Sequence, residues 1–228
     1  MISAADGYYT IFKMLDGNFT DKKVQKIYKN FKTFPSYIQV SLGVNYSFSN
    51  IPHYSKFAIE KSIKIDEKIE YDYINLRVFN FDNTMAPKGK TSLHTLFFTD
   101  NYTYWEYLRK NDKVRYQLEK DRIAREVIEI LDKKFGNIKS NIEEIDVSTP
   151  ATVIRYTNNW KGSYEGWLPS KQTGLQGLKK TLPGLENFYM IGQWIEIGGG
   201  VPAALLSGRN VTQIICKKDK KKFVTTHY

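Results

Sequence analysis

Three consecutive glycines near the end of this 228-residue chain constrain its fold more than any other feature. Gly198, Gly199 and Gly200 follow a short apolar run that begins at Asn187, and a helical pattern continues from them to Cys216. This order predicts a strand, a glycine turn and a helix. Glycines let the backbone approach a ligand closely, and the free N–H groups at the start of a helix attract negative charge. The segment therefore indicates a cofactor site.

The same segment also fits the spacing of a dinucleotide-binding fingerprint, G-x-G-x-x-G/A, through Gly198, Gly200 and Ala203. That fingerprint belongs to a βαβ unit, with an acidic residue about 20 positions further on. Only KKDKKKFVTTHY follows the helical pattern. We therefore expect no complete nucleotide-binding fold at Gly198, and the segment to form one edge of a site whose main body lies elsewhere.

Residues 192–211, GQWIEIGGGVPAALLSGRNV, closely resemble the C-terminal flavin motif of the phytoene desaturase, carotenoid isomerase and retinol saturase group of FAD-dependent oxidoreductases. Two other parts of the chain agree with this family in the same order. They are ISAAD at 2–6, and TP at 149–150 followed by RYT at 155–157 and WKGSYEGW at 160–167. The resemblance covers nearly all of the chain, but only the C-terminal part of the family's usual length.

The resemblance implies that the chain contributes to an FAD site. The implied cofactor-binding residues are Gly192, Gln193, Trp194, Gly198, Gly199, Gly200, Val201 and Ala203. Gln193 departs from the family, since many members have an acidic residue there; its amide can still donate a hydrogen bond, without charge. Arg209 fits either a contact to a cofactor phosphate or a structural salt bridge. No catalytic residue is assigned, because a flavin carries the redox chemistry itself.

Family members begin with a glycine-rich βαβ unit that binds the ADP half of FAD, and no such pattern precedes Gly192. We therefore expect a C-terminal fragment, a split-gene product or a truncated form of an FAD-dependent oxidoreductase. The resemblance implies a carotenoid- or retinoid-like polyene as substrate, and a desaturation, saturation or isomerisation. Such a chain is expected to be inactive without an N-terminal partner polypeptide. The alternative is a non-catalytic lipophile-binding or interaction module.

Hydrophobic periodicity predicts an α+β fold, a mostly antiparallel sheet with helices on one face, plus orphaned strand and helix pieces of a flavin domain. Asp6 and Thr20 are candidate N-caps of two short helices, and Asp112 and Gly136 are the expected bounds of the longest helix. The predicted strands lie at residues 38–44, 54–59, 73–79, 92–98 and 142–147. Of these, 73–79 and 92–98 are expected to be antiparallel neighbours.

With the family as a guide, four parts are expected along the chain. Residues 1–17 form a flavin-domain remnant, residues 18–186 a substrate-binding domain, residues 187–216 the C-terminal FAD-binding motif and residues 217–228 a basic tail. Unpaired strand edges and exposed apolar surface are expected where the flavin domain is incomplete.

Aromatic residues make up 14% of the chain and allow two interpretations. They line an apolar tunnel suited to a polyene, or they are ordinary core residues, since the two look alike in a sequence. The candidates are Tyr102, Tyr104, Trp105, Tyr107, Tyr156, Trp160, Tyr164 and Trp167.

The net charge of +10 does not by itself indicate nucleic-acid binding, because 24 acidic residues are mixed with the basic ones. Only the lysines at 217–222 are concentrated; they suit an anionic lipid surface or a solvated end. No segment resembles a membrane span or a signal peptide, so a cytoplasmic location is expected, with peripheral membrane contact left open. The scattered His53, His94 and His227 predict no metal site, and Cys216 no disulfide.

Overall fold

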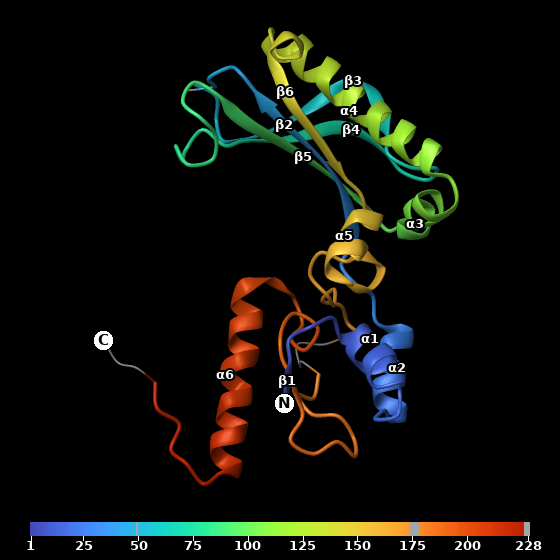
Figure 1. The fold of residues 1–228 in the computed structure, drawn as a ribbon, viewed down its shortest axis with the longest axis vertical. Helices are drawn as coiled ribbons and strands as arrows, with labels where there is room; N and C mark the ends of the chain where they lie inside the picture. The colour runs from blue at the N-terminus through green and yellow to red at the C-terminus, as the bar shows by residue number, and fades with distance from the viewer. Residues whose placement is uncertain (49, 174–177, 226–228) are drawn as a thin grey trace. The chain divides into compact units, whose positions relative to one another are not determined.

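The computed structural model describes residues 1–48, 50–173 and 178–225, and it divides the chain into two compact units. The sheet unit comprises Pro35–Arg155. The terminal unit combines Met1–Phe34 with Tyr156–Tyr228, so both ends of the chain contribute to it. Figure 1 shows the elements of each unit.

The sheet unit contains an antiparallel sheet of five strands in the order β3-β4-β5-β2-β6. Its strands are β2 (Ser36–Val44), β3 (Tyr54–Lys64), β4 (Glu70–Val78), β5 (Thr91–Thr99) and β6 (Ile142–Ser148). Alternate residues of β2 are buried, as expected for a strand with one face toward a core. The predicted pairing of the two middle strands is confirmed, since Leu76 of β4 lies opposite Thr95 of β5.

Helix α4 (Lys113–Phe135) lies across one face of this sheet and contacts β2, β3 and β6 (Figure 1). Both predicted bounds are confirmed: the Asp112 side chain accepts a hydrogen bond from the Arg115 N–H, and Gly136, at φ 69°, ends the helix. Helix α3 (Tyr102–Asn111), which the sequence did not indicate, precedes α4. Trp105 of α3 is fully buried in the core under the sheet, and α5 (Pro150–Thr157) follows β6.

The terminal unit begins with a short strand and two helical segments. They are β1 (Ile2–Ser3), α1 (Gly7–Tyr9), which runs into the π-helical turn Thr10–Met14, and α2 (Lys22–Asn30). The Asp6 cap is confirmed, because its carboxylate accepts from the Tyr9 N–H at 2.7 Å. The Thr20 cap is wrong: Asp21 caps α2 by accepting from the Val24 N–H at 2.8 Å, while the Thr20 hydroxyl donates to the Gly17 carbonyl.

The end of the chain adds β7 (Tyr189–Met190) and α6 (Gly200–Lys218) to this unit. Strand β7 pairs in parallel with β1, with Ile2 opposite Tyr189, and these two form a sheet of their own. The core beside them is aromatic: Trp167 and Trp194 are buried and meet edge to face at 5.2 Å. The α+β prediction, with separate strand and helix pieces beside an antiparallel sheet, is therefore confirmed.

The expected exposed surface is found on the terminal unit. Among the described residues, β1 and β7 pair only with each other, so each has an outer edge without a strand. Large apolar side chains stand exposed on the same unit: Met1, Ile2, Met14, Val201, Leu205, Leu206 and Ile214. Such a surface is typical of an interaction site.

The roles expected for the four parts of the chain stay predictions. The structure places residues 18–34 and 156–186 in the same compact unit as the expected flavin-domain pieces 1–17 and 187–216. In the basic tail, residues 226–228 lie outside the described residues.

Candidate functional site

The site expected from the glycine segment begins where β7 ends. The Ile191 N–H donates to the Ser3 carbonyl of β1 at 2.9 Å, which keeps the two chain ends together. The next N–H, that of Gly192, donates to the hydroxyl of Ser207 in α6 at 2.7 Å. Ser207 is fully buried and donates in turn to the Ala204 carbonyl, so it fastens the end of the strand to the helix. The sequence analysis did not single out Ser207.

The glycine turn between β7 and α6 has the backbone conformation that three glycines permit. Gly198, Gly199 and Gly200 have φ values of 99°, 63° and 81°. Gly199 also has ψ −168°, a combination that is essentially restricted to glycine. A Cβ atom on Gly199 would lie 2.5 Å from the Glu165 Cβ and 2.8 Å from the Glu165 carbonyl oxygen. The turn is therefore set both by its dihedral angles and by a close neighbour.

Helix α6 starts at this turn with an N-terminus that no described side chain caps. Its first N–H groups have no partner within the helix, and the helix dipole adds positive potential there. Val201 is 80% exposed and Ala203 is partly exposed, so this end of the helix is accessible. Pro202 has no N–H, but it suits a first turn. The arrangement can bind a negatively charged or electron-rich group through backbone N–H groups.

Glu165 lies beside this N-terminus, and the sequence analysis did not identify it as part of the site. Its Oε1 would lie 3.7 Å from a Cβ atom on Gly200. A carboxylate at the positive end of a helix is electrostatically favourable. The Glu165 carboxylate therefore lies close to where an anionic ligand would bind the N-terminus of α6.

Gln193 and Trp194 lie in the turn after β7 but differ in exposure. Gln193 is partly exposed, and its carbonyl packs so closely on Gly166 that a Cβ there would lie 2.6 Å from the oxygen. Trp194 is 2% exposed. Its carbonyl accepts from the Trp167 indole N–H at 2.9 Å, and its own indole N–H donates to Asn159. The Trp194 side chain thus belongs to the core.

Arg209 forms no structural salt bridge among the described residues, and its contact to a cofactor phosphate stays a prediction. Its guanidinium lies 6.0 Å from the centre of the Phe223 ring, and it forms no salt bridge with a described residue. The contact brings Phe223 of the basic tail near α6.

Two further polar side chains, Asp6 and Tyr28, lie buried in the terminal unit. The Asp6 carboxylate accepts from the backbone N–H groups of Tyr9 and Trp160, and burial raises its pKa although these hydrogen bonds act in the opposite direction. The Tyr28 hydroxyl is buried and has no hydrogen-bond partner among the described residues. Burial and the nearby Asp6 raise the pKa of Tyr28. The sequence predicted Asp6 only as a helix cap, and it did not indicate the buried Tyr28 hydroxyl.

The aromatic candidates differ in burial, and their role in a substrate tunnel stays a prediction. Trp105 and Trp167 are fully buried and belong to the cores of different units. Trp160 stacks on Tyr8 with ring centres 5.0 Å apart in the terminal unit. Tyr107 and Tyr156 are 64% and 73% exposed. The core interpretation is therefore confirmed for the buried tryptophans.

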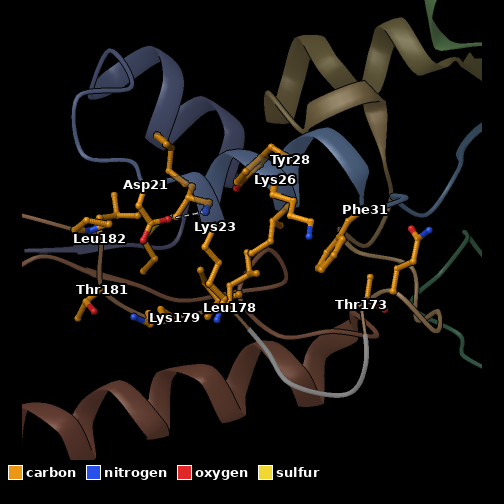
Figure 2. Close-up of a pocket in the computed structure, with 17 residues that line it drawn as sticks. Asp21, Lys23, Lys26, Tyr28, Phe31, Thr173, Leu178, Lys179, Thr181 and Leu182 are labelled. Carbon is orange, nitrogen blue, oxygen red and sulfur yellow. Dashed lines mark hydrogen bonds between the residues drawn. The ribbon is translucent and has the colours of Figure 1, made fainter.

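A cavity of about 370 Å³ lies within the terminal unit, away from the glycine turn. Its walls are α2 on one side and the segment 178–183 on the other (Figure 2). Buried apolar residues form its floor, namely Ile11, Ile27, Leu182, Met190 and Ile195. This cavity could not be predicted from the sequence, because its two walls are some 150 positions apart in the chain.

The described residues include neither a metal-binding cluster nor a helix able to span a membrane. No group of three or more His, Cys, Asp or Glu side chains there is placed to hold a metal ion, and His227 lies outside this part of the chain. Within the same residues, every helix is too short or too polar to cross a membrane.

Comparison with known proteins agrees with the predicted resemblance. No protein-family model matches the chain. Individual relatives do match, and they are carotenoid-modifying enzymes whose C-terminal part the chain resembles over about nine tenths of its length. The resemblance predicted from residues 192–211 is thereby confirmed.

Two kinds of enzyme represent these relatives. Prolycopene isomerase of Arabidopsis thaliana is 27% identical over 214 residues, and that of Daucus carota is 28% identical; each match covers 91% of the chain. A 4,4'-diaponeurosporene oxygenase of Staphylococcus aureus is 24% identical over 88% of the chain. The matches cover 35%, 34% and 41% of these proteins, so the chain spans about a third to two fifths of their length.

Proposed function

We propose that the chain is the C-terminal portion of an FAD-dependent oxidoreductase that acts on a carotenoid- or retinoid-like polyene. The observation that carries this proposal is the glycine turn, which exposes the uncapped N-terminus of α6 at the end of a parallel strand pair. Open α/β sheets bind their ligands at such strand ends. The names of the relatives, an isomerase and an oxygenase of carotenoids, support the substrate class.

The residues present fit one edge of a flavin. Backbone N–H groups of Gly200, Val201 and Ala203 would hold the pyrimidine edge, where negative charge develops, and the α6 dipole would stabilise that charge. The partly exposed Gln193 amide would donate to the polar chain of the cofactor. The flavin, when bound, supplies the hydride or electron transfer.

Glu165 opposes binding of a negatively charged flavin edge at the N-terminus of α6. Its carboxylate lies beside the α6 N-terminus and competes there with any anionic group. Replacing it by glutamine removes the charge and keeps the shape. We therefore expect Glu165→Gln to strengthen flavin binding.

The exposed apolar surface of the terminal unit supports a missing N-terminal half. Val201, Leu205, Leu206 and Ile214 stand exposed along α6, and the strand pair has free edges. In this proposal a dinucleotide-binding half covers them and supplies the remainder of the flavin domain. The chain alone is expected to have no activity.

Reconstitution tests the proposal directly. The chain is co-expressed with the N-terminal half of a relative, and flavin absorbance is measured on the purified complex. Val201→Pro removes one N–H from the first turn of α6, where proline is tolerated, and is expected to weaken flavin retention. Val201→Ala keeps that N–H and is the matched control. A complex that retains no flavin in any form counts against the proposal.

The alternative is a non-catalytic lipophile-binding module, and the cavity in the terminal unit favours it. The described residues that line this cavity all come from the terminal unit of the chain itself. Binding of a polyene by the chain in the absence of any flavin, unchanged by Val201→Pro, would support the alternative.

Contact with a membrane surface is a further part of the proposal. The terminal unit has 16 Lys and Arg against 7 Asp and Glu, so it carries +9 of the chain's net charge of +10. A basic surface is attracted to anionic lipid by about 1 kcal/mol per lysine close to the membrane. Co-sedimentation with anionic vesicles, and its loss at high salt, tests this contact.

A further inference from the structure

We propose that the cavity of the terminal unit binds a single anionic amphiphile, a long-chain carboxylate, independently of the flavin motif. A volume of about 370 Å³ lies within the range of about 300–1,000 Å³ that is typical of small-molecule sites. The cavity is closed off below by the buried side chains of its floor and reaches the surface between α2 and the segment 178–183 (Figure 2).

The walls of the cavity match an apolar chain. Val24 of α2 and Phe31, which directly follows this helix, stand half-buried on one wall, and Leu178 stands half-buried on the other. Figure 2 shows the labelled residues of α2 facing those of the opposite segment across this space. A ligand with a hydrocarbon tail would cover apolar surface that is otherwise open to water, and this favours binding.

The rim of the cavity is positively charged. Lys23, Lys26 and Lys179 line it, are exposed, and form no salt bridge with a described residue. The next residue, Lys180, is different, because it pairs with Glu196 at 2.9 Å. Among the described residues that line the cavity, Asp21 is the one acidic residue, and its carboxylate is already engaged in capping α2. The rim thus has an excess of two positive charges, which suits an anionic head group.

The occupant follows from this combination. A neutral polyene would fill the apolar part but gain nothing from the lysines. An inorganic anion would meet the lysines but leave the floor uncovered. A carboxylate with a hydrocarbon tail would place the tail on the apolar floor and the head group beside the lysines. The head group would stay in water at the rim, where the lysine ammonium groups also lie.

The test uses the full chain and titration calorimetry with fatty-acid carboxylates of increasing length, below their micelle concentrations, beside neutral alcohols of the same lengths. Affinity is expected to rise by about fourfold for each buried methylene and then to level off once the cavity is full. Each carboxylate is expected to bind more tightly than its alcohol.

The variant Lys23→Gln/Lys26→Gln/Lys179→Gln is expected to lose up to about fivefold in carboxylate affinity for each lysine and to bind the alcohol as before. Lys22→Gln/Lys29→Gln, on the same helix but outside the cavity, is the matched control and is expected to retain the preference for carboxylate. Val24→Phe, which narrows the cavity, is expected to lower the affinity for both the carboxylate and the alcohol.

Several results would overturn the proposal. They are equal affinity for carboxylate and alcohol, an equal loss in the control variant, or adsorption to anionic vesicles without binding of soluble carboxylates. Because flavin is absent from all these measurements, their failure leaves the proposed flavin role untouched. Failure of the flavin reconstitution likewise leaves this site untouched.

Discussion

Replacing Gly199 by alanine tests whether the glycine turn is built as described. Gly199 precedes α6 at φ 63° and ψ −168°. An alanine Cβ in this position would lie 2.5 Å from the Glu165 Cβ and 2.8 Å from the Glu165 carbonyl oxygen. Both are atoms close to the backbone, so rotation of a flexible side-chain end cannot relieve the contact.

The expected loss of stability has two parts. A non-glycine residue in this region of φ and ψ costs about 1–3 kcal/mol. Forcing neighbouring backbone apart in a well-packed region costs about a further 1–3 kcal/mol. Gly199→Ala should therefore lower the free energy of unfolding of the terminal unit by about 2–6 kcal/mol, a large share of the 5–15 kcal/mol typical of a domain.

Gly208 provides the matched control, because it lies within α6 itself. A Cβ on Gly208 would meet no atom within 4 Å. Alanine is the better helix former, so Gly208→Ala should stabilise by about 0.5–1 kcal/mol. Urea unfolding followed by tryptophan fluorescence compares the variants, since Trp160, Trp167 and Trp194 lie in the terminal unit and Trp105 does not.

The reasoning would be refuted if Gly199→Ala unfolded at the same urea concentration as the wild type, or at a higher one. A loss of stability in Gly208→Ala equal to that in Gly199→Ala would also refute it. In that case the loss would reflect any added methyl group near α6 rather than the geometry of the turn.

Three further predictions concern the terminal unit. Tyr28→Phe removes a buried hydroxyl that has no hydrogen-bond partner among the described residues. The free energy of unfolding, from thermal or urea unfolding, should therefore stay unchanged or rise by up to about 2 kcal/mol. A clear loss would reveal a partner for the hydroxyl. Burial raises the pKa of Asp6 in the folded state, so the protonated carboxyl stabilises the folded state relative to the ionised one. This contribution to the free energy of unfolding is fully present below about pH 4 and is lost as pH rises through the folded-state pKa. Urea unfolding from pH 3 to 7 should show the wild type losing stability relative to Asp6→Asn, and the opposite slope would contradict this. Leu205 is 75% exposed, and Leu205→Glu should reduce self-association of the isolated chain in light scattering without altering its circular dichroism.

The sheet unit was largely predictable because its strands expose one face and bury the other. The alternating residues of β2 and β5 give a period of two that is visible in the sequence. Helix α3 was missed although Asn101, a favoured N-cap residue, precedes it: only Trp105 and Leu108 of its ten residues are buried, too few to give a clear helical period. At α2, Thr20 and Asp21 are adjacent cap candidates, and only the three-dimensional course of the chain decides between them.

The candidate site was predictable only in its local part. Three consecutive glycines at 198–200 can be seen in the sequence itself, and they indicate a turn with positive φ values, as the structure has. Glu165 and Ser207 could not be found in this way, since each acts on residues far from it in the sequence. Their contributions depend on the packing of the whole unit.

The distribution of charge and apolar surface explains how the two proposed sites coexist in one unit. The sheet unit is almost neutral, with 18 basic and 17 acidic residues, and its long helix covers a face of its sheet. The terminal unit has nearly all of the excess positive charge and several exposed apolar side chains. Ile195 and Ile197, just before the glycine turn, pack in its aromatic core, whereas the N-terminus of α6 has no side-chain cap among the described residues. An incompletely covered unit can offer the flavin edge at one place and the cavity at another. The two sites should therefore respond separately to Val201→Pro and to the lysine substitutions.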